Sequence, residues 1–216
     1  MNSIQEAYDN WSLKYDSDNN LTRDLDRIVT QKTLADFNCN LIAEMGCGTG
    51  KNTSFLSQIG SQVQAIDFSQ AMLNKAKEKL DSDNVTFSMG DITEKWILSD
   101  RSVDLVTCNL VLEHIQDLSF IFSEANRVLI DGGIMFVSEL HPFKQYLGTK
   151  ANYKTGKGVV KITSFVHHIA DFFNAAKNNG LIVEDLQEWW HEADKGKPPR
   201  LVSFTFKKQR KNNRQL

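Results

Sequence analysis

Residues 41–50, LIAEMGCGTG, place a short apolar run directly before three glycines at alternate positions. The run Leu41–Met45 is typical of a buried strand, and the residues after Gly50 open a helix. Glycines at such a junction let the backbone turn sharply and come close to a ligand that side chains would block. The N–H groups at the start of the helix favour an anionic or acceptor-rich group. This stretch therefore predicts a strand, a ligand-binding loop and a helix.

Apolar runs alternate with amphipathic segments along the chain. The runs typical of buried strands are Leu41–Met45, Val63–Ile66, Val85–Ser88, Val103–Thr107 and Ile134–Val137. One intervening helix has Ser69 as its expected N-cap, and another is expected to stop at Asp131-Gly132-Gly133. This alternation predicts an α/β fold, in which helices cover both faces of a parallel sheet. Leu181–Trp189 and Leu201–Phe206 predict an antiparallel hairpin at the end of that sheet.

Composition and charge exclude several classes of protein. The chain is 41% hydrophobic and 24% charged, and its net charge of -2 provides no global field for nucleic acid or an anionic membrane. The three cysteines, Cys39, Cys47 and Cys108, are odd in number and not clustered, which argues against a disulfide framework or a metal site. No signal peptide and no run of ~18 apolar residues is evident. We expect a cytoplasmic protein without a membrane span.

Two acids follow the second and third predicted strands. Asp67 ends the second strand, where a carboxylate can accept both hydroxyls of a ribose. Asp91 ends the third, where an acid suits an exocyclic amine such as that of adenine. The carboxyl ends of parallel strands line one crevice, so we expect both acids to meet the glycine loop there. Phe68, Met72 and Ile92 are candidates for sandwiching the ring.

Two other nucleotide-binding patterns do not fit. A dinucleotide fingerprint, G-x-G-x-x-G/A, requires a small last residue for close packing of helix on strand, and that position here is Lys51. An NAD-dependent oxidoreductase is therefore the least favoured reading. A P-loop motif is also missing from the sequence.

At these positions the chain resembles a known family. The segments Glu44–Gly50, Asp67, Gly90-Asp91 and Leu110–Ile115 are similar to class I S-adenosylmethionine-dependent methyltransferases. More narrowly, they resemble the small-molecule group related to the quinone-biosynthesis and malonyl-carrier-protein methyltransferases. The leader Tyr8-Asp9…Tyr15-Asp16 is similar to that group's tyrosine–aspartate repeat, although Trp11-Ser12 replaces its alanine-centred segment. The resemblance implies a Rossmann-like seven-stranded, mostly parallel sheet with an antiparallel last strand and an N-terminal helical lid.

At roughly 150 residues a domain, the 216 residues favour a single methyltransferase domain with additions. We expect an N-terminal lid over 1–40, a cofactor-binding core over 41–140, a cap insertion over 142–165, a C-terminal helix and β-hairpin over 166–207, and a basic tail over 208–216. Within the lid region, a helix is expected to bury Leu21, Leu25, Ile28 and Val29 on one side. The tail, with Lys207, Lys208, Arg210, Lys211 and Arg214, is read as solvated.

The resemblance also implies a role for each site residue in binding S-adenosyl-L-methionine. The loop, Gly46, Cys47, Gly48, Thr49 and Gly50, and Glu44 before it would hold the methionine end. Asp67 would bind the ribose, and Asp91 with Ile92, Phe68 and Met72 the adenine. Asn109 would lie under the sulfonium, while Tyr15 and Tyr8 would fold over the carboxylate.

The reaction would be an in-line displacement of the methyl group, in which alignment supplies most of the catalysis. An acceptor that carries a proton also needs a base. His141, just after the fifth strand, is the first candidate, and His114 is the second; His167, His168 and His191 are the other histidines.

We expect a small apolar or aromatic acceptor, held by the lid, the 142–165 insertion and the loop between the last two strands. These regions supply the aromatic side chains Trp11, Phe143, Tyr146, Tyr153, Phe165, Trp189 and Trp190. The oligomeric state has no signal in the sequence. Two alternatives remain open: an RNA methyltransferase that uses the basic tail, and a cofactor-binding protein without transferase activity.

Overall fold

The computed structural model describes residues 3–155 and 158–210, which contain one seven-stranded sheet of order β3-β2-β1-β4-β5-β9-β8. Neighbours among the first five strands are parallel, whereas β9 runs antiparallel to both β5 and β8. The predicted Rossmann-like sheet with an antiparallel last strand is confirmed. Its strands are β1 (Cys39–Met45), β2 (Gly60–Asp67), β3 (Val85–Met89), β4 (Val103–Asn109), β5 (Leu129–Leu140), β8 (Leu181–Trp189) and β9 (Leu201–Lys208).

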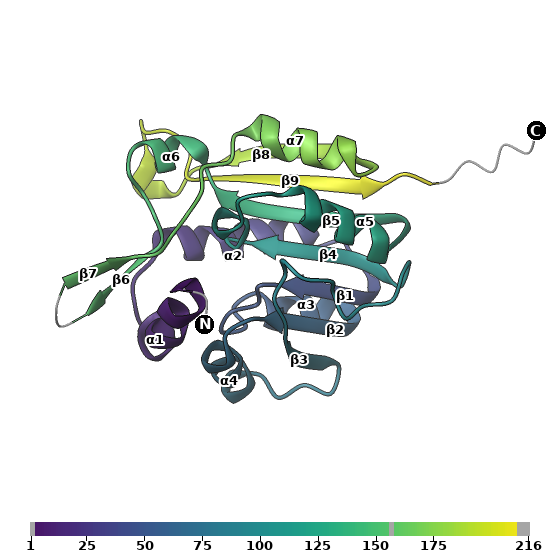
Figure 1. Cartoon of the computed structure of the whole chain (residues 1–216), viewed down its shortest axis with the longest axis horizontal. Coiled ribbons are helices and arrows are strands. Elements are labelled where there is room, and N and C mark those ends of the chain that lie inside the picture. Colours follow the sequence, from purple (N-terminus) through teal and green to yellow (C-terminus); the bar gives the residue numbers. More distant parts are fainter. Residues whose placement is uncertain (1–2, 156–157, 211–216) are drawn as a thin grey trace, which may run out of the picture.

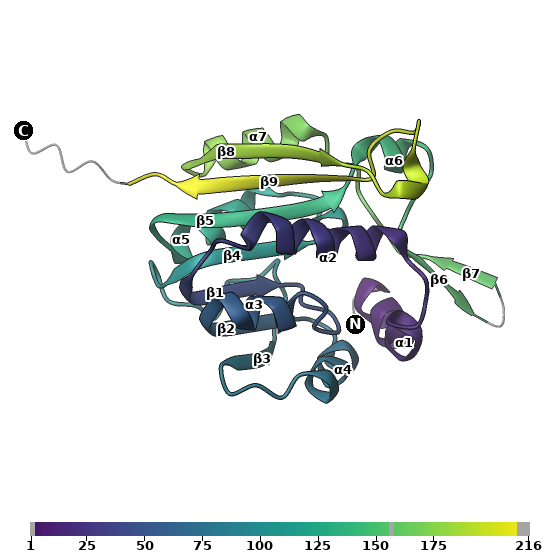
Figure 2. The same cartoon turned by 180° about the vertical axis from the view of Figure 1, so that it is seen from behind.

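Helices cover both faces of this sheet, as predicted. α2 (Leu21–Leu34) and α3 (Thr53–Ile59) lie on one face, and α5 (Ser119–Val128) and α7 (Ile169–Asn178) on the other (Figures 1 and 2). Each face has its own apolar core, with Ile42, Val63 and Phe136 in the first and Phe122 and Phe204 in the second. The fold is thus two apolar layers around one twisted sheet.

The remaining elements gather at the carboxyl ends of the parallel strands. Figure 1 shows α1, α4 and the β6–β7 hairpin at that end. The α4 helix begins after Ser69, whose Oγ accepts a hydrogen bond from the Met72 N–H, as its predicted N-cap role requires. These elements are α1 (Ser3–Tyr15), α4 (Gln70–Lys79), η1 (Leu112–His114), α6 (Pro142–Tyr146), β6 (Asn152–Thr155), β7 (Gly158–Lys161) and η2 (Glu192–Asp194).

The start of β5 differs from the sequence expectation. The helix before it already ends at Val128, so the Asp131-Gly132-Gly133 segment lies inside the strand and does not stop the helix. Gly132 has a φ of +86°, and the pairing of β5 with β4 shifts register between Val103 and Leu105. Gly132 and Gly133 therefore lie at an irregularity in the pairing of β4 with β5. Glycine is as common at such irregularities as at the ends of helices.

The buried side of α2 also differs from the expectation. Leu25 and Val29 are buried as expected, but Ile28 is 53% exposed. Two charged residues, Arg23 and Asp26, are buried in its place. The apolar pattern of α2 could not predict this, because the pattern does not reveal which buried positions of a helix lie against a polar site.

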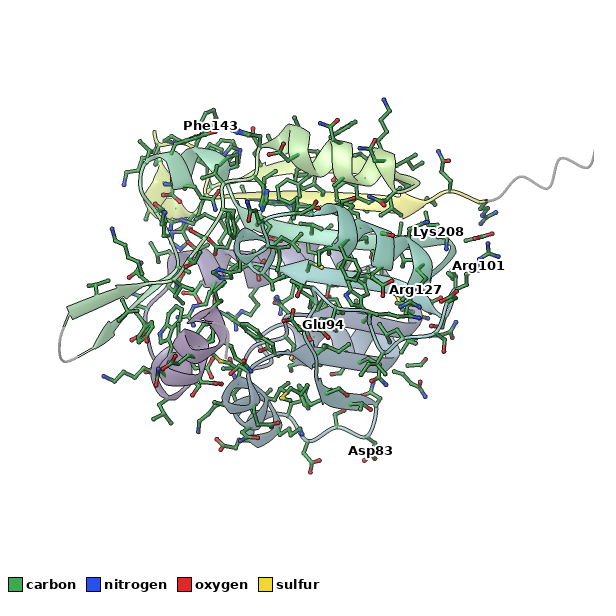
Figure 3. The ribbon with its side chains drawn as sticks, in the orientation of Figure 1. Asp83, Glu94, Arg101, Arg127, Phe143 and Lys208 are labelled. Carbon is green, nitrogen blue, oxygen red and sulfur yellow. The ribbon has the colours of Figure 1, made fainter. Side chains whose placement is uncertain are left out.

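The last strand takes up part of the expected tail. Lys207 pairs with Glu184 (2.7 Å), and Lys208 donates to the carbonyl oxygens of Asn126 and Leu129. Figure 3 places Lys208 at the opposite end of the sheet from α1. Lys208 is therefore buried and not solvated, whereas the Lys207 side chain stays partly exposed. Lys211 and Arg214 lie outside the described residues. In the described part of the chain, no helix has the length and apolar character to cross a membrane.

Candidate functional site

The glycine loop follows β1 and is held by its own backbone geometry. Gly46, Gly48 and Gly50 have φ angles of +78°, +54° and +77°, a region that other residues rarely adopt. A Cβ on Gly46 would lie 2.6 Å from Val111 Cγ2, whereas a Cβ on Gly48 would meet no heavy atom within 4 Å. Gly46 is therefore fixed by packing, and Gly48 leaves one side of the loop open to a ligand.

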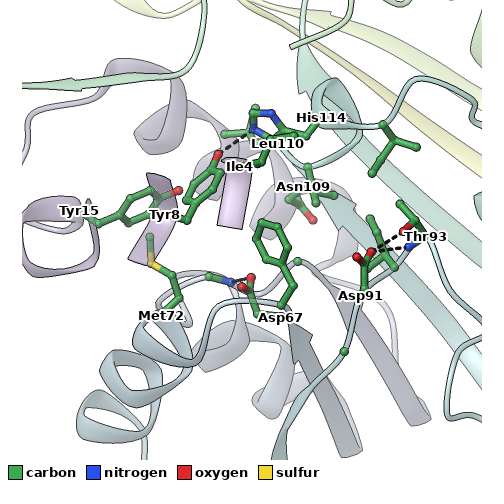
Figure 4. Close-up of a pocket in the computed structure, with 17 residues that line it drawn as sticks. Ile4, Tyr8, Tyr15, Asp67, Met72, Asp91, Thr93, Asn109, Leu110 and His114 are labelled. Atoms are coloured by element: carbon green, nitrogen blue, oxygen red, sulfur yellow. Dashed lines mark hydrogen bonds between the residues drawn. The ribbon is translucent and has the colours of Figure 1, made fainter. Parts of the chain in front are cut away.

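A first cavity lies at the carboxyl ends of β1 to β4 (Figure 4). Residues from α1, the glycine loop, the ends of β2 and β3, and the segment after β4 line it together. The cavity thus brings together, from distant parts of the chain, the predicted site residues Tyr8, Tyr15, Gly46, Gly48, Asp67, Phe68, Met72, Asp91, Ile92, Asn109 and His114.

Asp67 links the loop to the start of α4. Its Oδ2 accepts from the Gly48 N–H (2.8 Å), and its Oδ1 accepts from the Ser69 N–H (2.9 Å). Each carboxylate oxygen can accept a second hydrogen bond, so both remain able to receive a hydroxyl from a ligand. Burial raises the pKa of Asp67 to about 6.

Asp91 lies at the outer rim of the same cavity. It is exposed, and its Oδ1 accepts from the backbone N–H and the hydroxyl of Thr93 (2.8 and 2.7 Å). These contacts fix the carboxylate at the end of β3. Phe68, Met72 and the buried Ile92 supply apolar walls beside it.

A second cavity adjoins the first and shares Tyr15, Gly48 and Asn109 with it. Glu44, Cys47 and Thr49 line this second cavity, as do Arg23, Asp26 and Asn52. The Thr53 hydroxyl donates to Glu44 Oε2 (2.5 Å), and burial raises the pKa of Glu44 to about 8. The pKa of the Cys47 thiol is also raised by burial, so its side chain stays protonated. The Thr49 hydroxyl donates to Asp16 (2.7 Å) and ties the loop to the residue after α1.

Arg23 is a residue of this site that the sequence did not single out. Its guanidinium is buried, lies 4.0 Å from the centre of the Tyr15 ring, and donates to the carbonyl oxygens of Tyr15 and Asp18. In the described part of the chain it has no carboxylate within ion-pair distance, and its Nε has no hydrogen-bond partner. A buried cation without an anion is costly, which points to an anionic group supplied by a ligand.

Asp26 is a second residue of this kind, and it fixes the floor between the two cavities. Its Oδ1 accepts from Asn109 Nδ2 (2.8 Å), and its Oδ2 accepts from Asn52 Nδ2 (3.0 Å). Asn109 Nδ2 also donates to Thr30 (2.8 Å), which leaves the buried Asn109 Oδ1 without a partner among the described residues. An unpaired buried amide oxygen favours an electropositive ligand group beside it.

The two predicted base candidates lie in different surroundings. His114 lines the first cavity and contacts the Tyr8 hydroxyl. His141 caps α6: its Nδ1 accepts from the Phe143 N–H (3.2 Å), and its Nε2 lies 2.9 Å from Glu188 Oε1. It is not among the described residues that line the three cavities discussed in this section.

A third cavity opens beyond α1 and meets the first at Tyr8, Tyr15 and Leu110. Four aromatic side chains line it, those of Tyr8, Trp11, Tyr15 and Tyr153. The Trp11 ring stacks on the Tyr153 ring at a centroid distance of 5.6 Å. Its polar lining includes Asp18, Arg23, Glu113, Lys150 and Arg200.

Leu110 lies on the wall common to all three cavities and has a φ of +52°. Such a conformation costs a residue with a side chain about 1–2 kcal/mol and is concentrated at functional sites. Of the aromatic residues expected near the acceptor, Trp11 and Tyr153 line the third cavity. Phe143, Tyr146 and Trp190 are exposed.

Comparison with known proteins agrees with this geometry. Residues 43–137 match the model of the methyltransferase domain family. The malonyl-[acyl-carrier protein] O-methyltransferase of Hamiltonella defensa is 30% identical over 138 residues, which cover 64% of this chain and 52% of that protein. The demethylmenaquinone methyltransferase of Staphylococcus aureus is 33% identical over 144 residues, 63% of this chain and 59% of that protein. The chain thus spans about half the length of these curated relatives.

Among solved structures, the complex of DhpI with SAH superposes with a TM-score of 0.74 at 20% identity, over 96% of both chains. At that identity the likeness concerns the fold. Residues 43–137 are thus similar to a methyltransferase domain, and the sheet order and the glycine loop agree with that similarity. The curated proteins that the chain is similar to include malonyl-[acyl-carrier protein], ubiquinone-biosynthesis and demethylmenaquinone methyltransferases.

Proposed function

We propose that the protein transfers the methyl group of S-adenosylmethionine to a small aromatic acceptor. The observation that carries the proposal is the pair of adjoining cavities, with Asp67 in the first and Arg23 in the second. The Asp67 carboxylate suits the ribose diol at one end of an adenosyl amino acid, and the buried Arg23 guanidinium suits the carboxylate at the other end. A dinucleotide would instead need a second nucleotide site.

The cofactor roles are assigned from these positions. Asp67 would accept the ribose hydroxyls, while Asp91 and Ile92 would flank the adenine together with Phe68 and Met72. Arg23, a residue additional to those expected from the sequence, would pair with the methionine carboxylate, and Glu44 would face the amino group. Asn109 Oδ1, which lacks a partner, would lie beside the sulfonium.

The acceptor would occupy the third cavity, because that cavity joins the first at Tyr8, Tyr15 and Leu110. Its aromatic walls, Trp11 and Tyr153 among them, favour a flat ring. The nearby Lys150 and Arg200 would tolerate an acidic substituent. The relative named for ubiquinone biosynthesis supports a small ring acceptor, whereas the relative named for malonyl-[acyl-carrier protein] methylation acts on a small group that a protein carries.

Bound S-adenosylmethionine supplies an activated methyl group with a neutral thioether as leaving group. The chain's own contribution is alignment and exclusion of water, which in well-oriented systems supplies up to about 7–11 kcal/mol. The α1 helix serves this purpose, since Asp9 accepts from Ser69 (2.5 Å) and Gln5 donates to the Phe68 carbonyl oxygen (2.6 Å). We also place the protein in the cytoplasm, because its three cysteines are free and buried.

Calorimetric titration tests the first half of this proposal. Adenosylhomocysteine should bind one molecule per chain, and NAD should not bind. Methyl transfer from labelled S-adenosylmethionine to a set of small phenols, with an RNA transcript and a short peptide as comparison acceptors, tests the second half. Labelled product from the phenols alone supports the proposal. Absence of adenosylhomocysteine binding, or transfer only to the RNA or the peptide, would contradict it.

A further inference from the structure

Tyr8 and His114 form a hydrogen-bonded pair next to the junction of the first and third cavities. The Tyr8 Oη lies 2.8 Å from His114 Nε2, and His114 Nδ1 lies 2.7 Å from the Thr163 carbonyl oxygen (Figure 4 shows the first contact). A carbonyl oxygen can only accept, so Nδ1 carries the ring hydrogen and Nε2 is the acceptor. The Tyr8 hydroxyl therefore donates to Nε2, and its oxygen retains a lone pair for another donor.

We propose that Tyr8 takes the proton of the acceptor and passes its own proton to His114, an inference that rests on the proposed methyl transfer. Tyr8 lines both the first and the third cavity, so it stands where the methyl donor and the acceptor would meet. Tyr8 is then the catalytic residue that touches the acceptor, and His114 is the base behind it. Thr163 fixes the orientation of the imidazole.

The proposed step balances as follows. The acceptor O–H bond breaks as its proton joins Tyr8 Oη, while the Tyr8 hydroxyl proton moves to His114 Nε2. The freed oxygen lone pair forms the new bond to the methyl carbon, and the electron pair of the C–S bond returns to sulfur. The products are the methyl ether, neutral adenosylhomocysteine and an imidazolium whose Nδ1–H remains on Thr163. Release of that proton to water restores the pair.

The surroundings of the pair support a relay over direct ionisation of Tyr8. Burial, followed by the charges of Tyr15, Glu113, Asp67 and Glu139, raises the pKa of Tyr8 well above its usual value. Tyr15 lies on α1, Asp67 at the end of β2, Glu113 on η1 and Glu139 on β5. Tyr8 therefore stays protonated unless a neighbour accepts its proton.

His114 is suited to be that neighbour. Burial lowers the pKa of His114, which keeps the imidazole neutral and able to accept at neutral pH. The alternative base, His141, has its acceptor nitrogen occupied by the Phe143 N–H.

The Tyr8→Phe variant tests the relay with two acceptors of different acidity. Phenylalanine keeps the ring and removes only the oxygen. At a pH where 4-nitrophenol is ionised and 4-methylphenol is not, turnover of 4-methylphenol should fall by about 100-fold or more. Turnover of 4-nitrophenol should change by less than about threefold, because this acceptor has no proton to give. Adenosylhomocysteine affinity, measured by calorimetry, should stay near that of the wild type.

Tyr146→Phe provides the matched control. Tyr146 and His168 form another hydrogen-bonded tyrosine–histidine pair (2.9 Å). Both residues are exposed, and neither lines any of the three cavities. This variant should turn over both phenols like the wild type. His114→Ala should show the same acceptor-selective loss as Tyr8→Phe, and added imidazole should restore part of it.

Failure of the relay and failure of the proposed function give different results. A wild-type protein that binds adenosylhomocysteine but methylates neither phenol overturns the acceptor class, and the relay with it. A Tyr8→Phe variant that keeps full activity on 4-methylphenol, or that loses equal activity on both phenols, overturns the relay alone. An equal loss would show that Tyr8 only shapes the cavity.

Discussion

Asp67 connects three parts of the site through one carboxylate. It accepts from the N–H groups of Gly48 and Ser69, and it lines the first cavity. Any substitution there alters the loop, the start of α4 and the ligand contact together. Its chemistry is therefore best tested by the smallest possible change.

Asp67→Asn should weaken adenosylhomocysteine binding about 30-fold, equivalent to about 2 kcal/mol, because an amide has one accepting oxygen where a carboxylate has two. Calorimetry measures this directly. Asp83→Asn, an exposed change in the loop after α4 (Figure 3), should leave the affinity unchanged. Wild-type affinity in Asp67→Asn would contradict the ribose role.

Arg23 makes a separate prediction about the other end of the ligand. Arg23→Met keeps the apolar stem against Tyr15 and removes the charge. We expect adenosylhomocysteine to bind about 10- to 100-fold more weakly, whereas 5′-methylthioadenosine, which lacks the carboxylate, should bind the variant and the wild type alike. An equal loss for both ligands would show that Arg23 acts through the fold.

At this scale the sequence predicted the residues that follow strands and left out those on α2. Gly48, Asp67 and Asp91 are predictable because strand ends in a parallel sheet converge. Arg23 and Asp26 are not, because Asp26 contacts Asn109 across 83 positions of the chain. Only the packing of α2 on the sheet brings them together.

Among the elements, the glycine loop separates stability from binding. A methyl group on Gly46 would lie 2.6 Å from Val111, whereas one on Gly48 enters open space in the site. Both glycines have positive φ, so the cost of backbone strain is similar for the two, about 1 kcal/mol. The two alanine variants should therefore fail in different ways.

Gly46→Ala should lower the free energy of unfolding about 1–3 kcal/mol more than Gly48→Ala does, because the new methyl group clashes with Val111. Urea denaturation measures the difference, and adding Val111→Ala should recover part of it. Gly48→Ala should instead lose adenosylhomocysteine affinity. Equal stabilities of the two variants would contradict the loop geometry.

The elements themselves were predictable where the pattern is local. The strands from Leu41 to Val137 and the final hairpin follow from short apolar runs. The bulge at Gly132 and the β6–β7 hairpin do not, since glycine serves turns, helix ends and irregular strands alike. Their form depends on which neighbouring backbone is available for pairing.

At the scale of the whole molecule, the buried carboxyl groups near the proposed cofactor site make the stability of the fold depend on pH. Burial raises the pKa of Glu44 to about 8 and that of Glu113 to about 7. A carboxyl whose pKa is raised in the folded state stabilises the fold while it is protonated, and this contribution is lost as the pH rises through the folded value. Histidines are neutral in both states above their usual pKa of about 6.5, so they do not oppose the effect there.

The free energy of unfolding of the ligand-free protein should therefore fall as the pH rises from about 6.5 to 8.5. Urea denaturation at a series of pH values measures the slope. Glu44→Gln should flatten it, because glutamine does not titrate, whereas Glu184→Gln on the exposed side of β8 should not. A free energy that is constant or rises over this range would contradict the assignment.

The central claim is that one adenosyl amino acid lies across the carboxyl ends of β1 to β4, and a crystal structure with adenosylhomocysteine tests it most directly. We predict adenine beside Asp91 and Ile92, ribose hydroxyls on Asp67, and the carboxylate on Arg23. Ligand density elsewhere on the protein, or a trough filled by side chains in the presence of saturating adenosylhomocysteine, would contradict the account.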